Sequence, residues 1–352
     1  MPSLDSGDWT SNTTLEELAR RVQGSRRLLC LTHSKPDGDA IGSTLALVRA
    51  AIARGQQAAV LYLPPWPERF DAIVNDTPII HEHHHVWSEP ALVEADTIAI
   101  LDTGSWNQVA DARQFLQSRL DRVFVVDHHA HGHPDLGIVR YIDSSAASAC
   151  QIVAELCRQV LGLPAVRDLP PDIAGALYLG TATDTGWFRH SNTTPAVLRL
   201  AADLIEAGAP HNELYQLVEQ NESMSRLRVL SKALANLKLL DDGRVAMVSL
   251  SRKEIAECEA VPDDLGGLSD LPGSIASVRV TAVLIEMEPQ LTKLSMRSKP
   301  ARPGMPLIDV NQIAQKLGGG GHVQASGAKL HMPLDQARKA VAAALGAALN
   351  EE

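Results

Sequence analysis

Short apolar segments that stop at a histidine or an aspartate constrain this sequence most. Four short apolar segments occur in the first half of the chain, at residues 27–32, 58–63, 97–101 and 123–126, and three of them stop in this way. His33 follows the first, Asp102 the third and Asp127 the fourth. Short continuous apolar runs are typical of strands in a parallel sheet that is covered on both faces. Ligands of such sheets bind beyond the carboxyl ends of the strands, so we expect these polar side chains to converge there.

Helical patterns separate these strand segments. Thr14 and Glu17 have the spacing of a capping box, which predicts a helix that ends near Gly24. A second helix is expected over residues 41–54, after a turn at residues 34–39. Strands that alternate with helices favour an α/β fold with a mainly parallel sheet.

The pattern changes after residue 194, and we predict three parts: a catalytic domain over 1–194, a helical connector over 195–240, and a smaller α/β domain over 241–352. Asp241 and Asp242 are expected in a hairpin turn that precedes the first strand of the last domain. Its further expected elements are strands at 244–250, 278–286 and 291–296, a helix at 310–317, a glycine loop at 318–322 and a helix at 334–349.

Length and charge narrow the classes of function. A chain of 352 residues fits two domains better than one core. Its net charge of -10 argues against long duplex nucleic acid as a partner, which requires a large positive surface. The four cysteines are scattered without metal-site spacing, and neither a secretory leader nor an apolar span of membrane length is evident. We therefore expect a cytoplasmic protein that is not bound to a membrane.

Eight histidines and aspartates form the strongest chemical signal. They are His33, Asp37, Asp39, Asp102, Asp127, His128, His129 and Asp184. Imidazoles mixed with carboxylates suit Mn²⁺ or a similar divalent ion, and the lack of cysteine argues against structural zinc. Carboxylates crowded together repel one another unless cations neutralise them, and two bridged divalent ions form a known centre for phosphoryl hydrolysis. Taken alone, Asp37 and Asp39 would more often mark a solvated turn.

The order of these residues resembles the four motifs of DHH phosphoesterases. The matching segments are His33-x3-Asp37-x-Asp39, the lone Asp102, Asp127-His128-His129, and Asp184 within Gly180-Thr181-Ala182-Thr183-Asp184-Thr185-Gly186. Residues 318–322 and Arg297-Ser298-Lys299 resemble the DHH-associated domain. The similarity extends over about residues 25–345. Among the subgroups it is most similar to the bifunctional oligoribonuclease/pAp phosphatases, on the segments 183–188 and 192–194.

The resemblance implies a role for each site residue. One Mn²⁺ would be held by His33, Asp37 and Asp102, and a second by Asp39, Asp102, His128 and Asp184, with Mg²⁺ or Co²⁺ as alternatives. His129 would contact the scissile phosphate or assist proton transfer, and Asp127 would orient an imidazole. The expected substrates are short RNAs, pApA and pAp.

The resemblance also places substrate binding in the second domain. The expected contacts come from Arg297, Ser298, Lys299, Gly319, Gly320, Gly321 and His322. Glycines let backbone N–H groups approach a phosphate, and arginine can bind one in a bidentate manner. A substrate cleft between the two domains would favour short oligonucleotides over long ones.

Several alternatives stay open at this point. The chain could instead be a cyclic-dinucleotide (c-di-AMP) phosphodiesterase, a class II pyrophosphatase-like enzyme, or a nucleotide-binding regulator without catalysis. Homodimers are common in such folds, so a homodimer is an alternative to a monomer. The histidine-rich segment 81–85, His131 and His133 are interpreted as loop residues, and Trp187 and Phe188 as packing residues.

Overall fold

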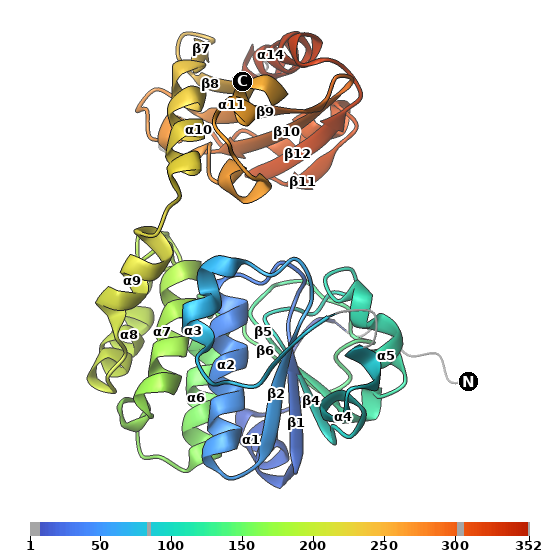
Figure 1. The fold of residues 1–352 in the computed structure, drawn as a ribbon, viewed down its shortest axis with the longest axis vertical. Helices are drawn as coiled ribbons and strands as arrows, with labels where there is room; N and C mark the ends of the chain where they lie inside the picture. The colour runs from blue at the N-terminus through green and yellow to red at the C-terminus, as the bar shows by residue number, and fades with distance from the viewer. Residues whose placement is uncertain (1–7, 83–85, 301–305, 351–352) are drawn as a thin grey trace. The chain divides into compact units, whose positions relative to one another are not determined.

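The computed structural model describes residues 8–82, 86–300 and 306–350, and the chain divides into two compact units, Met1–Asn221 and Glu222–Glu352 (Figure 1). The division falls inside the segment 195–240 that we expected as a separate connector. Helices α8 (Pro195–Glu206) and α9 (His211–Glu219) belong to the first unit, and α10 (Met224–Ala235) belongs to the second.

The first unit is built on a six-stranded parallel sheet of order β3-β2-β1-β4-β5-β6. Its strands are β1 (Arg27–Leu31), β2 (Gln57–Tyr62), β3 (Ile79–His81), β4 (Thr97–Leu101), β5 (Val123–Asp127) and β6 (Arg140–Ile142). The four predicted strands are confirmed as β1, β2, β4 and β5. The edge strands β3 and β6 were not predicted, because three residues are too few to show a pattern.

Helices cover both faces of this sheet. Helices α1 (Leu15–Gly24), α2 (Gly38–Ala53), α6 (Ala149–Leu161) and α7 (Pro171–Asp184) lie on one side, and the short α4 (Pro90–Val93) and α5 (Arg113–Gln117) on the other (Figure 1). Alternate residues of each strand therefore enter different cores: Leu28 and Cys30 enter one, Leu29 and Leu31 the other. Burial on both faces explains why the strands are continuous apolar runs.

Side-chain caps set where the helices begin. Thr14 and Glu17 form the predicted capping box of α1. Asp37 accepts hydrogen bonds from the backbone of Asp39 and Ala40, so α2 begins at Gly38, three residues before the predicted start. Asp39 therefore lies in the first turn of a helix and not in the predicted turn.

The second unit has a six-stranded mixed sheet of order β11-β12-β10-β9-β8-β7, in which only the β8–β9 pair is parallel. Its strands are β7 (Lys238–Leu240), β8 (Val245–Leu250), β9 (Val280–Glu288), β10 (Leu291–Ser298), β11 (Gly320–His322) and β12 (Ala325–Leu330). The hairpin turn at Asp241 and Asp242 is confirmed, with both residues at positive φ. The predicted glycine loop was partly wrong, because Gly320–His322 pair with β12 as the edge strand β11.

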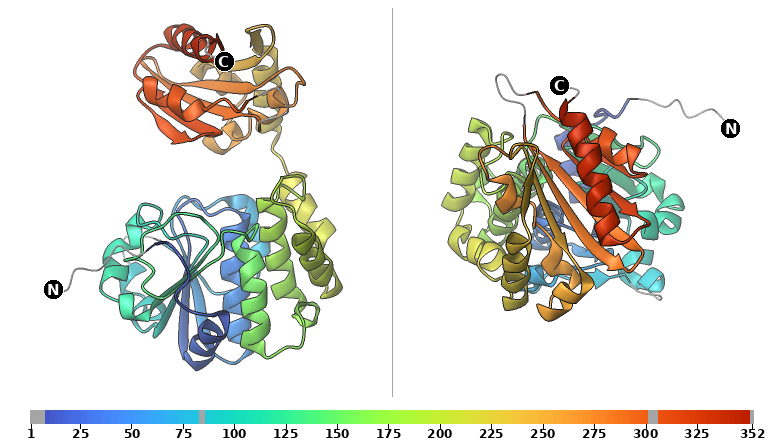
Figure 2. Two further views of the ribbon diagram at one scale, coloured as in Figure 1. Left: turned by 180° about the vertical axis from the view of Figure 1, so that it is seen from behind. Right: turned by 90° about the horizontal axis from the view of Figure 1, so that it is seen from above.

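Helices cover one face of this second sheet more completely than the other. Helix α13 (Val310–Lys316) and helix α14 (Leu334–Asn350), drawn in red in Figure 2, pack against Leu294, Met296 and Leu330. On the other face α10 packs against Val248 and Val283 of β8 and β9. The neighbouring strands β10 and β12 present exposed polar side chains there, because the side chains of a strand alternate between faces.

The remaining short elements connect the main ones. They are α3 (Asp71–Val74), α11 (Arg252–Glu257), α12 (Asp270–Gly273), and the 3-10 turns η1 (Glu68–Phe70), η2 (Val86–Ser88), η3 (Ala110–Ala112), η4 (Leu120–Arg122), η5 (Val166–Asp168) and η6 (Pro262–Leu265). Within the described residues, no helix is both long enough and apolar enough to cross a membrane.

Candidate metal centre

Asp102 lies at the middle of the cluster in the first unit, directly after β4. Its residue is 2 % exposed, and a φ of 61° places its backbone in the left-handed region, a strained conformation that is concentrated at functional sites. Its Oδ2 lies 3.4 Å from Nε2 of His33, and its Oδ1 lies 3.4 Å from Nε2 of His128. Oδ1 is buried and makes no hydrogen bond. The two oxygens of one carboxylate therefore face two different imidazoles.

His33 and Asp37 lie on one side of Asp102. Nδ1 of His33 is 2.9 Å from the carbonyl oxygen of Ser34, so Nδ1 donates and Nε2 is left facing the carboxylates. Oδ1 of Asp37 lies 3.9 Å from this Nε2 while it caps α2. The end of β1 and the start of α2 thus bring both residues to Asp102.

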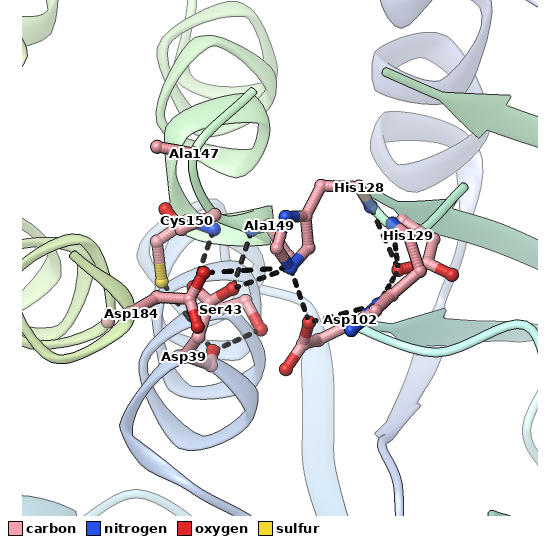
Figure 3. Close-up of polar contacts among 12 residues, drawn as sticks. Asp39, Ser43, Asp102, His128, His129, Ala147, Ala149, Cys150 and Asp184 are labelled. Carbon is pink, nitrogen blue, oxygen red and sulfur yellow. Dashed lines mark hydrogen bonds and ion pairs between the residues drawn. The ribbon is translucent and has the colours of Figure 1, made fainter. Parts of the chain in front are cut away.

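His128 faces two further carboxylates on the other side of Asp102. Its Nε2 lies 3.8 Å from Oδ2 of Asp39 and 3.8 Å from Oδ2 of Asp184. Figure 3 shows the His128 ring between Asp102 on one side and Asp39 and Asp184 on the other. Asp184 is the last residue of helix α7, so this side chain reaches the cluster from a helix end and not from a strand end.

Asp39 is held by the amino end of helix α6. Its Oδ2 accepts a hydrogen bond of 2.6 Å from the backbone N–H of Ala149, and its Oδ1 accepts one of 2.9 Å from Cys150 (Figure 3). These are the first two residues of the helix, whose N–H groups have no partner within it. The positive end of the helix dipole also favours a carboxylate at this place.

Two glycines allow α2, α6 and α7 to meet at the cluster. A Cβ on Gly38 would lie 2.2 Å from Oγ1 of Thr183, the residue before Asp184. A Cβ on Gly180 would lie 2.3 Å from Sγ of Cys150 and 2.8 Å from Oδ1 of Asp39. Any other residue at these two positions would push the helices that carry the acidic side chains apart.

Asp127 fixes the orientation of His129. The carboxylate is fully buried, and its Oδ1 accepts backbone hydrogen bonds from His128 at 2.8 Å and from His129 at 3.2 Å. Nδ1 of His129 lies 2.7 Å from the same oxygen. Because a carboxylate accepts, Nδ1 carries the proton and Nε2 is free. The side chain of His129 is 55 % exposed, so its free nitrogen is accessible to a ligand.

The charges of this cluster are balanced by protons. Burial of the imidazoles opposes protonation, but nearby carboxylates, Asp102 above all, raise the pKa values of His33 and His128 to about 9. Burial opposes ionisation of Asp102, yet the two imidazoles lower its pKa. Burial and neighbouring carboxylates raise the pKa of Asp39, and burial raises that of Asp184 to about 6. Such mutual repulsion is what a bound cation would relieve.

Three overlapping groups of side chains in this cluster could hold a metal ion. They are His33 with Asp37 and Asp102, Asp39 with His128 and Asp184, and Asp102 with His128 and His129. Within each group the ligand atoms lie within 4.8 Å of one another. The unpartnered Oδ1 of Asp102 and the mixture of nitrogen and oxygen donors fit a divalent cation.

The second unit contains an open groove on the uncovered part of its sheet. The groove has a volume of about 540 Å³, and among the predicted substrate residues Arg297, Gly319 and Gly320 line it. Lys293 and Lys329, which pair across β10 and β12, line it as well and were not predicted. Exposed cations and a glycine backbone on one face provide contacts suited to phosphate.

The structure separates the other predicted substrate residues from this groove. Ser298 and Lys299 line a different, small pocket beside Arg279, and Nζ of Lys299 donates to the carbonyl oxygen of Ile275 at 2.6 Å. His322 is exposed on the edge strand β11, opposite Ala325. Gly321 precedes it, and neither residue is among those that line the groove.

Packing explains most of the glycine run. Gly318 has a φ of 78° after helix α13. A Cβ on Gly319 would lie 2.1 Å from the carbonyl oxygen of Gly327, and one on Gly321 would lie 2.6 Å from that of Ala325. Only Gly320 in this run has neither a positive φ nor a close neighbour. Its lack of a side chain is therefore not required by the fold.

The remaining histidine and aromatic predictions have mixed outcomes. His81 is an exposed residue of β3 and not of a loop, and residues 83–85 of the same segment lie outside the described residues. His133 lies in the loop after β5, as predicted for it and for His131. Trp187 and Phe188 pack against the core of the first unit, as predicted.

Sequence reasoning missed the groups that hold the metal-site side chains in place. The α6 backbone that binds Asp39 leaves no mark in residue types, because any residue can supply an N–H group. Gly38 and Gly180 are visible in the sequence, but their need to be glycine depends on contacts between helices far apart in the chain. Asn192 was noted only for its motif, and its Nδ2 donates to the carbonyl oxygens of Ala147 and Asp184, both at 3.2 Å.

Known proteins are similar to this chain in sequence and in fold. The bifunctional oligoribonuclease and PAP phosphatase NrnA of Thermus thermophilus is 33 % identical over 337 residues, which are 95 % of this chain and 93 % of that protein. The cyclic-di-AMP phosphodiesterase PdeA of Listeria monocytogenes is 25 % identical over 94 % of this chain and 49 % of its own length. The crystal structure of an exopolyphosphatase-related protein from Bacteroides fragilis has a TM-score of 0.84 at 24 % identity, covering 94 % of this chain and 95 % of that one.

A family model locates the similarity on the cluster. The model of the DHH family, N-terminal domain, matches residues 27–181, which include His33, Asp102 and His128. Together with the relative that is 33 % identical along almost its whole length, this match shows that the chain belongs to the DHH family of phosphoesterases.

Proposed function

We propose that the cluster in the first unit holds two divalent cations and that these cations are Mn²⁺. One would be held by His33, Asp37 and Asp102. The other would be held by Asp39, Asp102, His128 and Asp184. The observation that carries this proposal is the placement of Asp102, whose two oxygens each lie 3.4 Å from a different imidazole. A carboxylate in this arrangement can bridge two ions.

The donor atoms favour Mn²⁺ over structural zinc or calcium. Carboxylate oxygens combined with imidazole nitrogens suit Mn²⁺, whereas structural zinc sites contain cysteine and calcium sites contain oxygen ligands alone. Cys150 is the cysteine nearest to the cluster, and its thiol donates to the carbonyl oxygen of Asp39. Bound at this place, the ions would supply Lewis-acid polarisation of the phosphate and lower the pKa of the attacking water.

The protein's own residues would then orient the substrate and move a proton. Asp127 holds Nδ1 of His129, so Nε2 of that ring can contact a phosphate oxygen or deliver a proton to the leaving oxygen. The buried carboxylate also stabilises the imidazolium form, because its hydrogen bond to the ring raises the pKa of His129. We therefore propose His129 as the general acid of the reaction.

We propose short oligoribonucleotides and pAp as the substrates. The Thermus thermophilus relative is named for both activities and aligns with nearly all of this chain. The groove of the second unit would bind a substrate phosphate through Arg297 and the backbone near Gly320, with Lys293 and Lys329 beside them. These local cations make phosphate binding compatible with the net charge of -10.

A substrate panel tests this function. Hydrolysis of pApA, pAp and an RNA of twenty or more residues would be measured with Mn²⁺, Mg²⁺ and Co²⁺, and the products identified. We expect turnover of pApA and pAp that is greatest with Mn²⁺ and much slower on the long RNA. Equal rates on short and long RNA would contradict the proposed substrate class.

A cyclic dinucleotide is the second candidate substrate, because the Listeria monocytogenes relative acts on cyclic-di-AMP and aligns with 94 % of this chain. Adding cyclic-di-AMP to the same panel separates the two. If it is cleaved faster than pApA and pAp, the chain is a cyclic-dinucleotide phosphodiesterase and the proposal above is wrong.

A further inference from the structure

Trp9 precedes helix α1, and its indole packs against three glycines of the first unit. A Cβ on Gly104 would lie 1.9 Å from Cζ2 of Trp9, and one on Gly132 would lie 2.3 Å from its Cε2. A Cβ on Gly137 would lie 3.4 Å from the same ring. Side chains at the first two positions would exclude the indole, because the interior is close-packed.

Two of these glycines lie in the two loops that carry site residues. Gly104 follows Asp102 by two residues, and Gly132 follows His129 by three. The loops also contact each other, since the backbone N–H of His133 donates to the carbonyl oxygen of Gly104 at 2.7 Å. One indole therefore packs against the loop of the bridging carboxylate and the loop of the general acid.

The single polar atom of the indole is directed at the site. Nε1 of Trp9 donates to the backbone carbonyl oxygen of His129 at 3.1 Å. The guanidinium carbon of Arg140 lies 5.8 Å from the ring centroid, within the range of a cation–π contact. The hydrogen bond fixes the backbone of His129 on one side while Asp127 fixes its ring on the other.

We propose that Trp9 is a positioning residue for His129. Its indole N–H holds the backbone of His129 so that the ring stays on Asp127 with Nε2 free. This inference rests on the general-acid role proposed for His129. It identifies a determinant of the reaction outside the segment 27–181 that matches the family model.

A purely structural reading of the same segment makes a different prediction. Asn12 donates from its backbone to the carbonyl oxygen of Arg140 at 3.0 Å and from Nδ2 to that of Ile138 at 2.7 Å. Ser11 bonds to both backbone groups of Ile142, so the segment covers the edge strand β6. If Trp9 only helped to hold this segment over β6, its loss would lower the stability of the protein and leave His129 undisturbed.

Chemical rescue distinguishes the two roles. In Trp9→Ala protein loaded with Mg²⁺, we expect the ring resonance of His129, assigned with His129→Gln, to shift and broaden in spectra of ¹³C-labelled histidine. Added indole should restore the resonance, whereas benzothiophene, which has the same shape and no N–H, should not. An unchanged resonance in Trp9→Ala, or equal rescue by both compounds, would overturn the proposal. Should the alanine variant unfold, Trp9→Phe keeps an aromatic ring and loses the N–H; the His129 resonance should then shift in the same way, and an unchanged resonance would overturn the proposal.

The activity assay adds the functional consequence. On bis-p-nitrophenyl phosphate with Mn²⁺ we expect Trp9→Ala to lower kcat about tenfold at unchanged KM, the usual effect of losing an outer-shell partner. Indole should restore kcat. Trp87→Ala is the control, because Trp87 packs against Phe115 in the same core cluster; it should lower stability and keep kcat. If kcat falls equally in both variants, the proposal is wrong. Wild-type protein without any hydrolysis would contradict the proposed function, and the resonance experiment would still decide the role of Trp9.

Discussion

The cluster of the first unit and the groove of the second differ in how firmly their side chains are held. Asp39 accepts two backbone hydrogen bonds, and Asp127, Asp102 and Asp39 are all nearly fully buried. The groove cations Lys293 and Arg297 are exposed on an open sheet surface. Nε1 of Trp9 and the amino end of α6 reinforce the cluster, whereas the guanidinium of Arg297 donates to the carbonyl oxygen of its own neighbour Met296 at 3.2 Å.

This difference is what we expect from the two ligands proposed above, divalent cations in the cluster and a phosphate in the groove. Carboxylates that repel one another stay together only if the fold positions them, and two closely spaced cations require accurate geometry. Phosphate binding by arginine and lysine tolerates variation, and long flexible side chains can follow different substrates. We therefore expect substitutions in the cluster to abolish the reaction and substitutions in the groove to change affinity.

The largest effect is expected for Asp102→Asn, which preserves shape and removes charge. Loss of the proposed bridging carboxylate should remove several kcal/mol of transition-state stabilisation, roughly a 10³-fold fall in kcat. Steady-state kinetics on bis-p-nitrophenyl phosphate measures it, and Asp111→Asn at an exposed position is the control. Wild-type kcat in Asp102→Asn would remove the distinction between cluster and groove.

The second largest effect is expected in the pH dependence of metal binding to the cluster. His33 and His128 have pKa values raised to about 9, so at neutral pH both are protonated before metal binds. Binding must displace these protons, and affinity for Mn²⁺ should rise about tenfold per pH unit for each proton released, up to about pH 9. Calorimetry from pH 6 to 8 in buffers of different ionisation enthalpy gives both the affinity for Mn²⁺ and the number of protons released. Affinity that is independent of pH would contradict this protonation state.

Arg297→Ala tests whether the groove contributes to substrate affinity and not to the chemical step. Losing a charge-assisted hydrogen bond to phosphate costs about 1.5–3 kcal/mol, which corresponds to a KM for pAp raised roughly tenfold to a hundredfold. kcat on bis-p-nitrophenyl phosphate should stay near the wild-type value. Lys299→Ala is the comparison, because Lys299 lines the other pocket and should raise KM less. If Lys299→Ala raised KM more than Arg297→Ala, phosphate would bind in the pocket of Lys299 and not in the groove.

The smallest effect is expected for Gly320→Ala, the one change in the glycine run that the fold tolerates. A methyl group here would hinder a phosphate that approaches the backbone, so KM for pAp should rise by a few-fold at unchanged thermal stability. Gly319→Ala, where a Cβ would lie 2.1 Å from the carbonyl oxygen of Gly327, should instead unfold the edge of the sheet. Unchanged KM in stable Gly320→Ala would show that phosphate does not contact this backbone.

The two regions also differ in how well the sequence predicts them. In the first unit, buried strands are short apolar runs that end at His33, Asp102 or Asp127, so both the sheet and the converging side chains follow from local pattern. The pattern could not show Asp184 at a helix end or Asp39 on the amino end of α6, because these depend on contacts between distant segments.

In the second unit the local pattern was weaker. Gly320–His322 read as a loop because glycine is depleted in strands, yet pairing with β12 makes them an edge strand. Arg297, Ser298 and Lys299 are consecutive in sequence, but they line different pockets. Alternation places Ser298 on the opposite face of β10 from Arg297, and Lys299 lies beyond the end of the strand. Lys293 and Lys329 come together only through strand register, which residue types do not specify.

Anomalous diffraction from crystals grown with Mn²⁺ tests the proposed two-metal centre most directly. We expect two manganese peaks in the first unit, about 3.5–4 Å apart, with one oxygen of Asp102 or both between them. His33 and Asp37 should contact one peak, and Asp39, His128 and Asp184 the other. A single peak, or manganese bound away from Asp102, would contradict the two-metal centre.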